Sequence, residues 1–181
     1  MLKRAFDIVF SACWLLGFSP LLLVVAILVR LRLGSPVLFV QERPGLRAKP
    51  FRMVKFRSMT DARGPDGELL PDEQRLTAFG RFLRATSLDE FPEMWNVLLG
   101  DMSVVGPRPL LMRYVPRYDA FQARRMEVKP GVTGWAQVNG LRGDTCLRER
   151  VKFDLDYIEN WNFVLDLQIM LMTLYKRGGA C

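Results

Sequence analysis

An uncharged stretch near the N-terminus, residues 8–29, constrains this chain more than any other feature. Its 22 residues are strongly apolar. As a straight helix they would be roughly 33 Å long, which is enough to cross the hydrocarbon core of a bilayer. A cleavable signal peptide fits poorly, because the stretch is long and because Arg30 and Arg32 follow it instead of a small-residue cleavage site. The sequence therefore predicts a membrane helix at residues 1–33 and a globular domain at residues 34–181.

Two details of this stretch argue against a straight span. Ser19-Pro20 lies near its middle, and a kink is expected there because proline removes a backbone hydrogen bond and clashes with the preceding turn. Basic residues flank both ends, with Lys3 and Arg4 before the stretch and Arg30 and Arg32 after it. Since such residues favour the cytoplasmic side, a helix that bends and leaves by the face it entered satisfies both clusters. A kinked single-pass anchor remains open, and the core helix of a soluble protein is a weaker alternative.

The net charge of +7 favours anionic partners, a class that includes nucleic acid, acidic lipid headgroups and phosphorylated substrates. Lipid and phosphate gain support from the segments described below, whereas nucleic acid gains none. The chain contains no histidine, which excludes Ser-His and Cys-His catalytic pairs and histidine metal sites. Any nucleophile must therefore be an Asp, Glu, Lys, Tyr, Cys, Ser or Thr side chain.

The globular part predicts an α+β fold that is mostly helical. Residues 37–41 and 51–59 have the character of strands and are separated by turn residues, which predicts a small β-hairpin. On the second strand one face would carry Phe51, Met53, Lys55, Arg57 and Met59. Helices are expected at residues 76–85, 87–99, 114–128, 147–161 and 163–175. The last is apolar enough to lie in the membrane interface, although a core helix fits equally well.

Two adjacent acids, Asp89 and Glu90, form the most informative segment. Ser87 and Glu90 have the spacing of a capping box, and Pro92 fits a first helical turn, so either Ser87 or Asp89 would be the N-cap of a helix. The helix dipole at that end would favour ionised carboxylates. An ionised Asp is a nucleophile towards phosphorus and a ligand for Mg²⁺. The plain alternative is that both acids only cap the helix.

Cations elsewhere in the chain shift the balance towards a site. Side chains of the kind that a diphosphate needs are Lys55, Arg57, Arg81, Arg84 and Arg108. Arg108 lies between two prolines, which stiffen the backbone that carries its guanidinium. A rigid planar fork suits phosphate oxygens.

These segments together resemble one family, the bacterial sugar transferases, which are small monotopic polyprenyl-phosphate phosphoglycosyl transferases. The resemblance covers nearly the whole chain. It is carried by Lys3-Arg4-x-x-Asp7, Ser19-Pro20, residues 54–59 (VKFRSM), 87–92 (SLDEFP), 100–103 (GDMS), 106–109 (GPRP) and 130–137 (PGVTGWAQ). No single motif is decisive, but their order and spacing make a chance similarity very improbable.

The resemblance implies a re-entrant membrane helix bent at Ser19-Pro20, with the catalytic domain on the cytoplasmic face of the bacterial inner membrane. It implies Mg²⁺, bound with the help of Asp89, and a UDP-sugar and undecaprenyl phosphate as substrates. Asp89 would attack the β-phosphorus and release UMP, and the lipid phosphate would then take the sugar phosphate. Glu90 would act as a base or order the site. The phosphate-binding residues would be Lys55, Arg57, Arg84 and Arg108, and Asp156 would lie in the active-site region.

Two other functions remain open from the sequence. A metal-dependent glycosyltransferase would use an acidic pair such as Asp154-Leu155-Asp156, although the chain is short for the nucleotide-binding sheet of such enzymes. A membrane adaptor without activity would bind anionic lipid through its basic surface, but it leaves Asp89, Glu90 and the rigid Arg108 unexplained. The sequence names neither the sugar nor the pathway, and it leaves self-association as a homodimer open.

Overall fold

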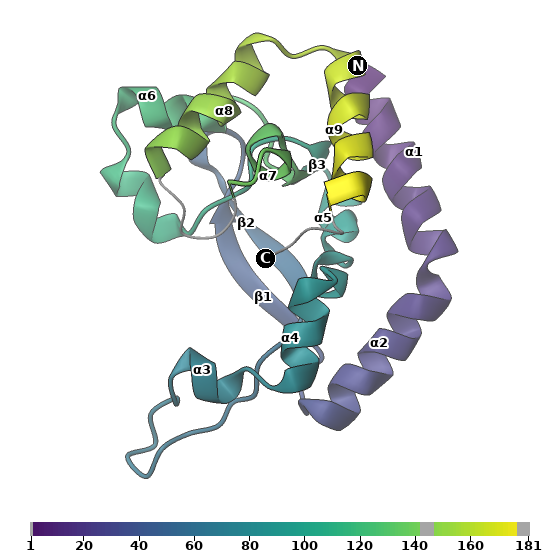
Figure 1. The fold of residues 1–181 in the computed structure, drawn as a ribbon, viewed down its shortest axis with the longest axis vertical. Coiled ribbons are helices and arrows are strands. Elements are labelled where there is room, and N and C mark those ends of the chain that lie inside the picture. Colours follow the sequence, from purple (N-terminus) through teal and green to yellow (C-terminus); the bar gives the residue numbers. More distant parts are fainter. Residues whose placement is uncertain (1, 142–146, 177–181) are drawn as a thin grey trace.

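The computed structural model describes residues 2–141 and 147–176, and it shows short helices packed around two small sheets (Figure 1). The predicted α+β, mostly helical class is confirmed. The α-helices are α1 Leu2–Gly17, α2 Ser19–Arg32, α3 Asp72–Arg75, α4 Ala78–Ala85, α5 Glu93–Leu99, α6 Ala120–Ala123, α7 Trp135–Val138, α8 Leu147–Glu159 and α9 Phe163–Lys176. The 3-10 helices are η1 Leu46–Ala48, η2 Leu88–Glu90, η3 Met112–Arg117 and η4 Arg124–Met126. The strands are β1 Leu38–Pro44, β2 Pro50–Phe56, β3 Ser103–Val105 and β4 Gly131–Thr133.

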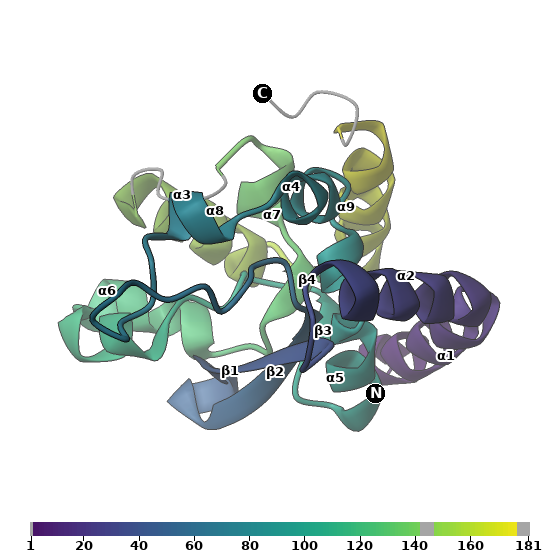
Figure 2. The same ribbon diagram turned by 90° about the horizontal axis from the view of Figure 1, so that it is seen from below.

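The apolar N-terminal stretch is divided into α1 and α2, which meet at a bend of 63°. The break falls at the predicted position, since α2 begins at Ser19 and has Pro20 in its first turn. The Ser19 hydroxyl donates to the carbonyl of Leu16 across the break. Within the described residues, no individual helix is both long and apolar enough to cross a bilayer, and only the bent pair meets both requirements. Both helices lie along one side of the molecule (Figure 2).

The first turns of α1 are tied into the globular part by polar side chains. Lys3 Nζ lies 2.6 Å from a carboxylate oxygen of Asp166 in α9. Arg4 donates to two carbonyls at the end of α5, over 2.6 and 2.8 Å. The buried Asp7 accepts from the Ser103 hydroxyl at 3.0 Å and from the backbone N–H of Val104 at 2.9 Å. These contacts fix the direction in which α1 leaves the body.

The end of α2 packs onto a different part of the same body. Val29 and Leu33 are buried there together with Phe56 of β2 and Leu83 of α4. A larger core lies between β2, α5, β3, α7, α8 and α9, and includes Met53, Val97, Met102, Val138, Tyr157 and Ile169. Each arm of the bent pair therefore rests on its own apolar cluster, and both clusters belong to one molecule.

The predicted hairpin is confirmed, with β1 and β2 antiparallel and in register from Leu38 opposite Phe56 to Pro44 opposite Pro50. The strand ends at Phe56, so the expectation that it continues to residue 59 is wrong. Phe51 and Met53 share a buried face with the half-buried Lys55, but Arg57 leaves that face. Arg57 turns because its guanidinium donates to the carbonyls of Ser35 and Met59.

The helix expected at residues 87–99 begins only at Glu93. Ser87 has left-handed backbone angles, with φ of 55°, and its side chain caps no N–H, so the predicted capping box is wrong. Ser87 is the N-cap residue only of the 3-10 helix η2, and Asp89 is not the N-cap of α5, because Pro92 takes that position. The physical reason is tertiary, since the Glu90 carboxylate contacts cations on other segments instead of its own backbone.

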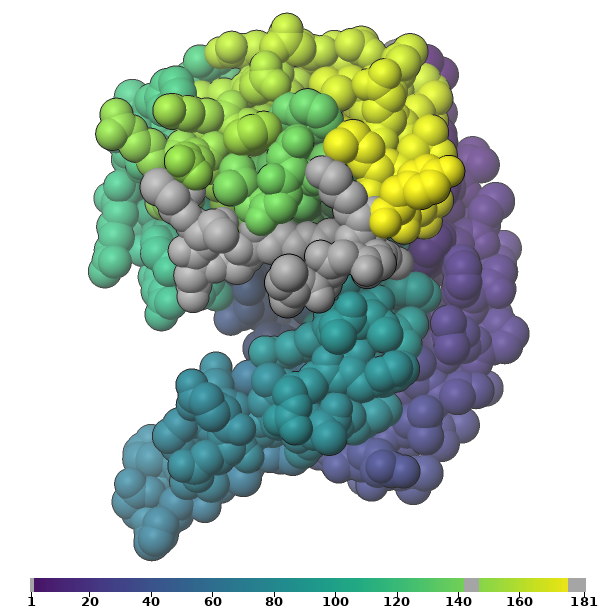
Figure 3. Space-filling view, in the orientation of Figure 1, coloured from purple at the N-terminus to yellow at the C-terminus, as the bar shows by residue number. Residues whose placement is uncertain are grey.

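The helix expected at residues 114–128 is also divided, into η3, α6 and η4. Pro116 lies inside η3, and Asp119 starts a new helix through a capping box with Gln122. The resulting bundle of short helices, together with α8, faces α3 and α4 across a hollow in the molecular surface (Figure 3).

Candidate active site

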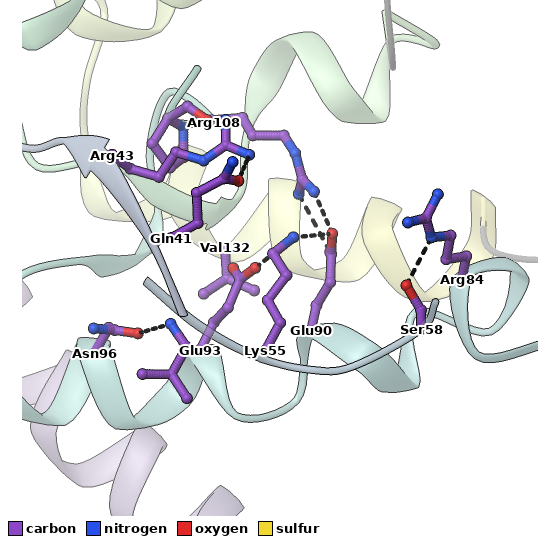
Figure 4. Close-up of polar contacts among 12 residues, drawn as sticks. Gln41, Arg43, Lys55, Ser58, Arg84, Glu90, Glu93, Asn96, Arg108 and Val132 are labelled. Atoms are coloured by element: carbon purple, nitrogen blue, oxygen red, sulfur yellow. Dashed lines mark hydrogen bonds and ion pairs between the residues drawn. The ribbon is translucent and has the colours of Figure 1, made fainter. Parts of the chain in front are cut away.

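An ion cluster centred on Glu90 brings three separate segments together (Figure 4). Lys55 Nζ of β2 donates to Glu90 Oε1 at 3.0 Å. Arg108, from the loop after β3, donates through one terminal nitrogen to Glu90 Oε2 at 3.2 Å, while its other terminal nitrogen contacts Oε1. Lys55 also lies 2.9 Å from the buried Glu93 of α5. A lysine and a bidentate arginine thus converge on one carboxylate.

The loop that carries Arg108 is held by a close backbone approach. Gly106 donates its N–H to the carbonyl of Thr133 at 2.9 Å. A Cβ at Gly106 would lie 2.5 Å from the carbonyl oxygen of Lys129 and 3.0 Å from the nitrogen of Gly131. Only glycine allows this approach, so the residue type at position 106 sets where the Arg108 side chain begins.

A buried ion pair supports the same loop from behind. Arg125 of η4 pairs with Asp154 of α8 over 2.6 Å, and both side chains are almost fully buried. The same terminal nitrogen of Arg125 donates to the backbone carbonyl of Arg108 at 2.9 Å. The pair therefore links α8 to the backbone of the residue that grips Glu90.

Asp89 lies next to this cluster and is buried, with 8% of its surface exposed. Burial, assisted by the negative charge of Glu90, raises the pKa of Asp89 from 3.8 to about 6, and the nearby cations Lys55, Arg84 and Arg108 oppose that shift. The expectation that a helix N-terminus would favour the charged form is therefore wrong, because Asp89 precedes α5 and is desolvated. Burial also acts on Glu90, but Arg108 and Lys55 outweigh it and hold the pKa of that carboxyl well below its ordinary value.

A cavity of about 290 Å³ opens beside the cluster and is rich in cations. Its charged lining consists of Arg43, Lys55, Glu93, Arg108, Arg113 and Arg150. Burial, and after it the positive charge of Arg108, lower the pKa of Arg43, so these two guanidinium groups repel each other. An anion in the cavity would relieve that repulsion.

Comparison with known proteins decides the family. The family model described as "Bacterial sugar transferase" matches residues 1–178. The chain belongs to the bacterial sugar transferase family. A relative from Bacillus subtilis (strain 168), the sugar transferase EpsL, is 52% identical over 176 residues, which are 97% of this chain and 87% of the relative.

Other members of the family are similar over the same region. The UDP-glucose:undecaprenyl-phosphate glucose-1-phosphate transferase of Escherichia coli (strain K12) is 42% identical over 97% of this chain, which spans only 40% of that protein. The exopolysaccharide production protein PSS of Rhizobium leguminosarum bv. phaseoli is 42% identical over 96% of this chain and 94% of its own length. The chain thus corresponds to nearly all of the small relatives and to about two fifths of the E. coli transferase.

The predicted phosphate-binding residues of this family member have different surroundings. Lys55 and Arg108 lie in the cluster. The exposed Arg84 donates its Nε to the Ser58 hydroxyl at 2.9 Å and points its terminal nitrogens away from that contact (Figure 4). The buried Arg57 donates to two carbonyls and pairs with Asp61, so its donors already have acceptors within the chain.

The two acids of Asp154-Leu155-Asp156 point to different places. Asp154 is buried against Arg125, whereas the exposed Asp156 accepts from Trp135 Nε1 at 2.9 Å and from Asn160 Nδ2 at 2.8 Å. Residues two apart on a helix face different sides, so this motif forms no joint metal site. The active-site role expected for Asp156 stays a prediction.

Sequence reasoning missed three residues of the site, namely Arg43, Glu93 and Arg125. Glu93 is fully buried, and burial together with Glu90 raises its pKa to about 7. The residue directly follows the recognised segment 87–92 and lies three positions after Glu90, so its place next to that segment was the available signal. Arg125 carries no motif, and only the fold reveals its contact with the Arg108 backbone.

The residues fit a divalent cation only in combination with a substrate. Within residues 2–141 and 147–176, no three acidic or cysteine side chains converge in the manner of a metal site. Asp89 nevertheless offers a buried carboxylate within electrostatic reach of Lys55 and Arg108, two cations that line the cavity. Mg²⁺ is usually bound by one or two carboxylates together with water and substrate phosphates, and a shared site of that kind is compatible with this geometry.

Proposed function

We propose that this chain transfers a sugar 1-phosphate from a UDP-sugar to a polyprenyl phosphate and releases UMP. One observation carries the proposal: the buried Asp89 lies within the electrostatic reach of Lys55, Arg84 and Arg108. A nucleophilic carboxylate among cations suits an attack on a diphosphate. The names of the E. coli and Klebsiella pneumoniae relatives, both UDP-glucose:undecaprenyl-phosphate glucose-1-phosphate transferases, support the same substrates.

In the first step a carboxylate oxygen of Asp89 attacks the β-phosphorus of the UDP-sugar. The new bond joins that oxygen to phosphorus, the bond from phosphorus to the bridging oxygen breaks, and UMP leaves with the electron pair. With a pKa of about 6, Asp89 is mostly ionised at neutral pH yet more basic than an exposed aspartate. Lys55 and Arg108 stabilise the charge that develops on the phosphoryl oxygens and on the leaving UMP.

In the second step a phosphate oxygen of the lipid attacks the phosphorus of the acyl-phosphate intermediate. The bond from Asp89 to phosphorus breaks, which regenerates the carboxylate and yields a polyprenyl diphosphate sugar. A covalent intermediate allows the soluble donor and the membrane-bound acceptor to use one pocket in turn. The same cations therefore serve both halves of the reaction.

Glu90 has the properties of a residue that orders the site. A carboxyl whose pKa is held low by Arg108 and Lys55 is a weak base. Its two oxygens instead fix the lysine and the guanidinium at the positions from which they reach phosphate. Of the two roles open from the sequence, the geometry therefore favours positioning.

Mg²⁺ would be held by Asp89 together with substrate phosphates, and it would supply further neutralisation of phosphate charge. The cation-rich cavity beside Glu93 and Arg108 has the size and charge to receive the diphosphate end of the donor. The chain's own contribution is to hold its cations in place before the substrate arrives.

For the membrane segment we propose a re-entrant bend that enters and leaves by the cytoplasmic face. The start of α1 is tied to α5 and α9, and the end of α2 is buried against Phe56 and Leu83. A single straight span would separate these ends by the thickness of the bilayer, which is incompatible with both contacts. Large apolar side chains between the two ends are exposed, including Leu16, Leu23 and Ile27.

Product analysis tests the proposed activity. The purified full chain, incubated with Mg²⁺, undecaprenyl phosphate and a panel of UDP-sugars, should release UMP with at least one donor. The panel should contain N-acetylated hexoses, galactose and glucose. Release of UDP instead would indicate a glycosyltransferase, and no turnover with any donor would favour a lipid-binding adaptor.

A further inference from the structure

A second hollow reaches the candidate active site at Glu90. It has a volume of about 250 Å³ and lies between α1, α9 and the η2–α5 segment. Its walls include Trp14, Phe91, Met94, Val132, Met170 and Thr173. Glu90 lines this largely apolar groove and pairs with Lys55 and Arg108, which line the cationic cavity, so the two cavities meet at the ion cluster.

The lining of the groove is unsuited to a sugar. Its two hydroxyl groups, on Thr133 and Thr173, hydrogen-bond to each other at 2.6 Å, and Thr173 also donates to the carbonyl of Ile169. A sugar buried there would leave its own hydroxyls without partners, which costs free energy. A hydrocarbon occupant has no such cost and gains from burial against the aromatic and aliphatic side chains.

The groove is bounded by helices whose outer faces are apolar. On α9 the side chains of Val164 and Leu171 are exposed outside the groove, and on α1 those of Val9 and Leu16 are exposed. A chain that leaves the groove between these helices therefore meets apolar surface and, in the proposed topology, lipid. A volume of about 250 Å³ is below that of ordinary ligand pockets, so only the first part of a long chain would be held.

The groove also contains a donor that the described part of the protein does not use. Trp14 Nε1 is buried and has no hydrogen-bond partner among the described residues. The indole is fixed by ring contacts with Phe91 and Phe18, at centroid distances of 5.1 and 4.3 Å. A buried N–H of this kind costs free energy unless an acceptor reaches it, and an occupant with an oxygen-rich head and an apolar body supplies one.

We infer that this groove binds the first isoprene units of the polyprenyl phosphate acceptor, with its phosphate at Lys55 and Arg108. The inference rests on the proposed function. Charge complementarity decides between occupants, because the two cations beside Glu90 require an anionic head on an apolar chain. The polyprenyl chain thus enters from the membrane side, whereas the UDP-sugar enters through the cationic cavity.

Filling the groove tests the inference. In Thr173→Phe a ring would occupy the space of the first isoprene units. We expect the KM for undecaprenyl phosphate to rise at least about tenfold, as for the loss of pocket contacts of this size. Single-turnover release of UMP from the UDP-sugar without lipid should stay within about twofold of the parent, since that half-reaction does not use the groove.

Leu171→Phe is the matched control. Leu171 lies on the same helix with 56% of its surface exposed, so this substitution places the same aromatic ring outside the groove. It should leave both half-reactions unchanged. If Thr173→Phe also loses the donor half-reaction, both half-reactions should be measured in Thr173→Leu, whose side chain is smaller than Phe. Equal losses in both half-reactions of Thr173→Leu would overturn the inference.

Two further outcomes keep the inference separate from the proposed function. An unchanged KM for undecaprenyl phosphate in Thr173→Phe, with an active parent enzyme, overturns the groove alone. A lower kcat with an unchanged KM would indicate that a bulk membrane lipid occupies the groove, which also overturns it. A parent enzyme that releases no UMP from any donor contradicts the proposed function itself.

Discussion

Glu90 and Arg108, which are 18 positions apart in the chain, form a two-point contact at the centre of the site. The guanidinium meets both carboxylate oxygens, and Lys55 meets one of the same oxygens from the β-hairpin. The contact joins the loop after β3 to the turn that carries Asp89. The position of Asp89, the proposed nucleophile, relative to its cations therefore depends on an acid that need not react itself.

Replacing Glu90 with Gln tests this positioning role. The amide keeps the shape but loses the charge that holds Lys55 and Arg108, and kcat should fall about 100-fold. Because the charge of Glu90 raises the pKa of Asp89, the acid limb of the pH–rate profile should also move below pH 6. The exposed Glu127→Gln is the control. A loss of rate with an unmoved acid limb would argue for a different role.

Asp89→Asn should abolish turnover, because an amide cannot form the acyl-phosphate intermediate. The expected loss in kcat is at least about 1,000-fold, and a radiolabelled sugar phosphate should no longer become attached to the protein. Asp66→Asn, in an exposed loop, should behave as the parent does. Normal labelling of Asp89→Asn would remove this residue from the mechanism.

The activity of the parent should depend on the ionisation of Asp89. Since the carboxylate is the attacking form and its pKa is about 6, the rate of the donor half-reaction should fall as pH decreases through 6. Rapid-quench measurement of UMP release between about pH 4.5 and 8 gives the profile. A rate that stays constant down to about pH 4.5 would contradict the raised pKa.

The same pKa shift predicts a stability effect with a definite sign. The folded-state pKa of about 6 exceeds the ordinary 3.8, so stability is lost as pH rises through that interval. At neutral pH, Asp89→Asn should therefore raise the free energy of unfolding by up to about 3 kcal/mol. Near pH 4 the difference should largely disappear. Thermal unfolding of both proteins at the two pH values measures it, and a less stable variant at neutral pH would contradict it.

Asp154→Asn should weaken the support of Arg108. Removing the charge leaves Arg125 buried without its ionic partner, at a cost of about 3 kcal/mol. Since Arg125 also donates to the Arg108 backbone, the KM for the UDP-sugar should rise together with the loss in stability. Asp156→Asn, two residues further along α8, is the control for stability, because the exposed Asp156 does not pair with Arg125. If Asp154→Asn keeps both its stability and its KM, the pair has no supporting role.

The proposed re-entrant topology predicts that both ends of the apolar segment lie on one side of the membrane. A tag at the N-terminus and a tag in the exposed loop near Asp66 should both resist reagents applied outside intact cells. Both should be labelled after permeabilisation. External labelling of one tag alone would show a true span.

Much of this arrangement follows from local chemistry in the sequence. Pro20 lacks a backbone donor, so the break at Ser19-Pro20 arises wherever the rest of the chain lies. Turn residues between two strand-like segments likewise specify the hairpin of β1 and β2. The acids and cations of the site are also visible as motifs.

Only the tertiary structure decided which charges meet and which of them are buried. The Glu90 carboxylate does not cap its own helix, because it binds Lys55, which is 35 positions away, and Arg108 instead. The pKa of Asp89 rises because burial removes water, which outweighs a helix end that begins only at Glu93. The energy of a charge depends on its solvent and its neighbours in space, and a linear pattern of residues contains neither.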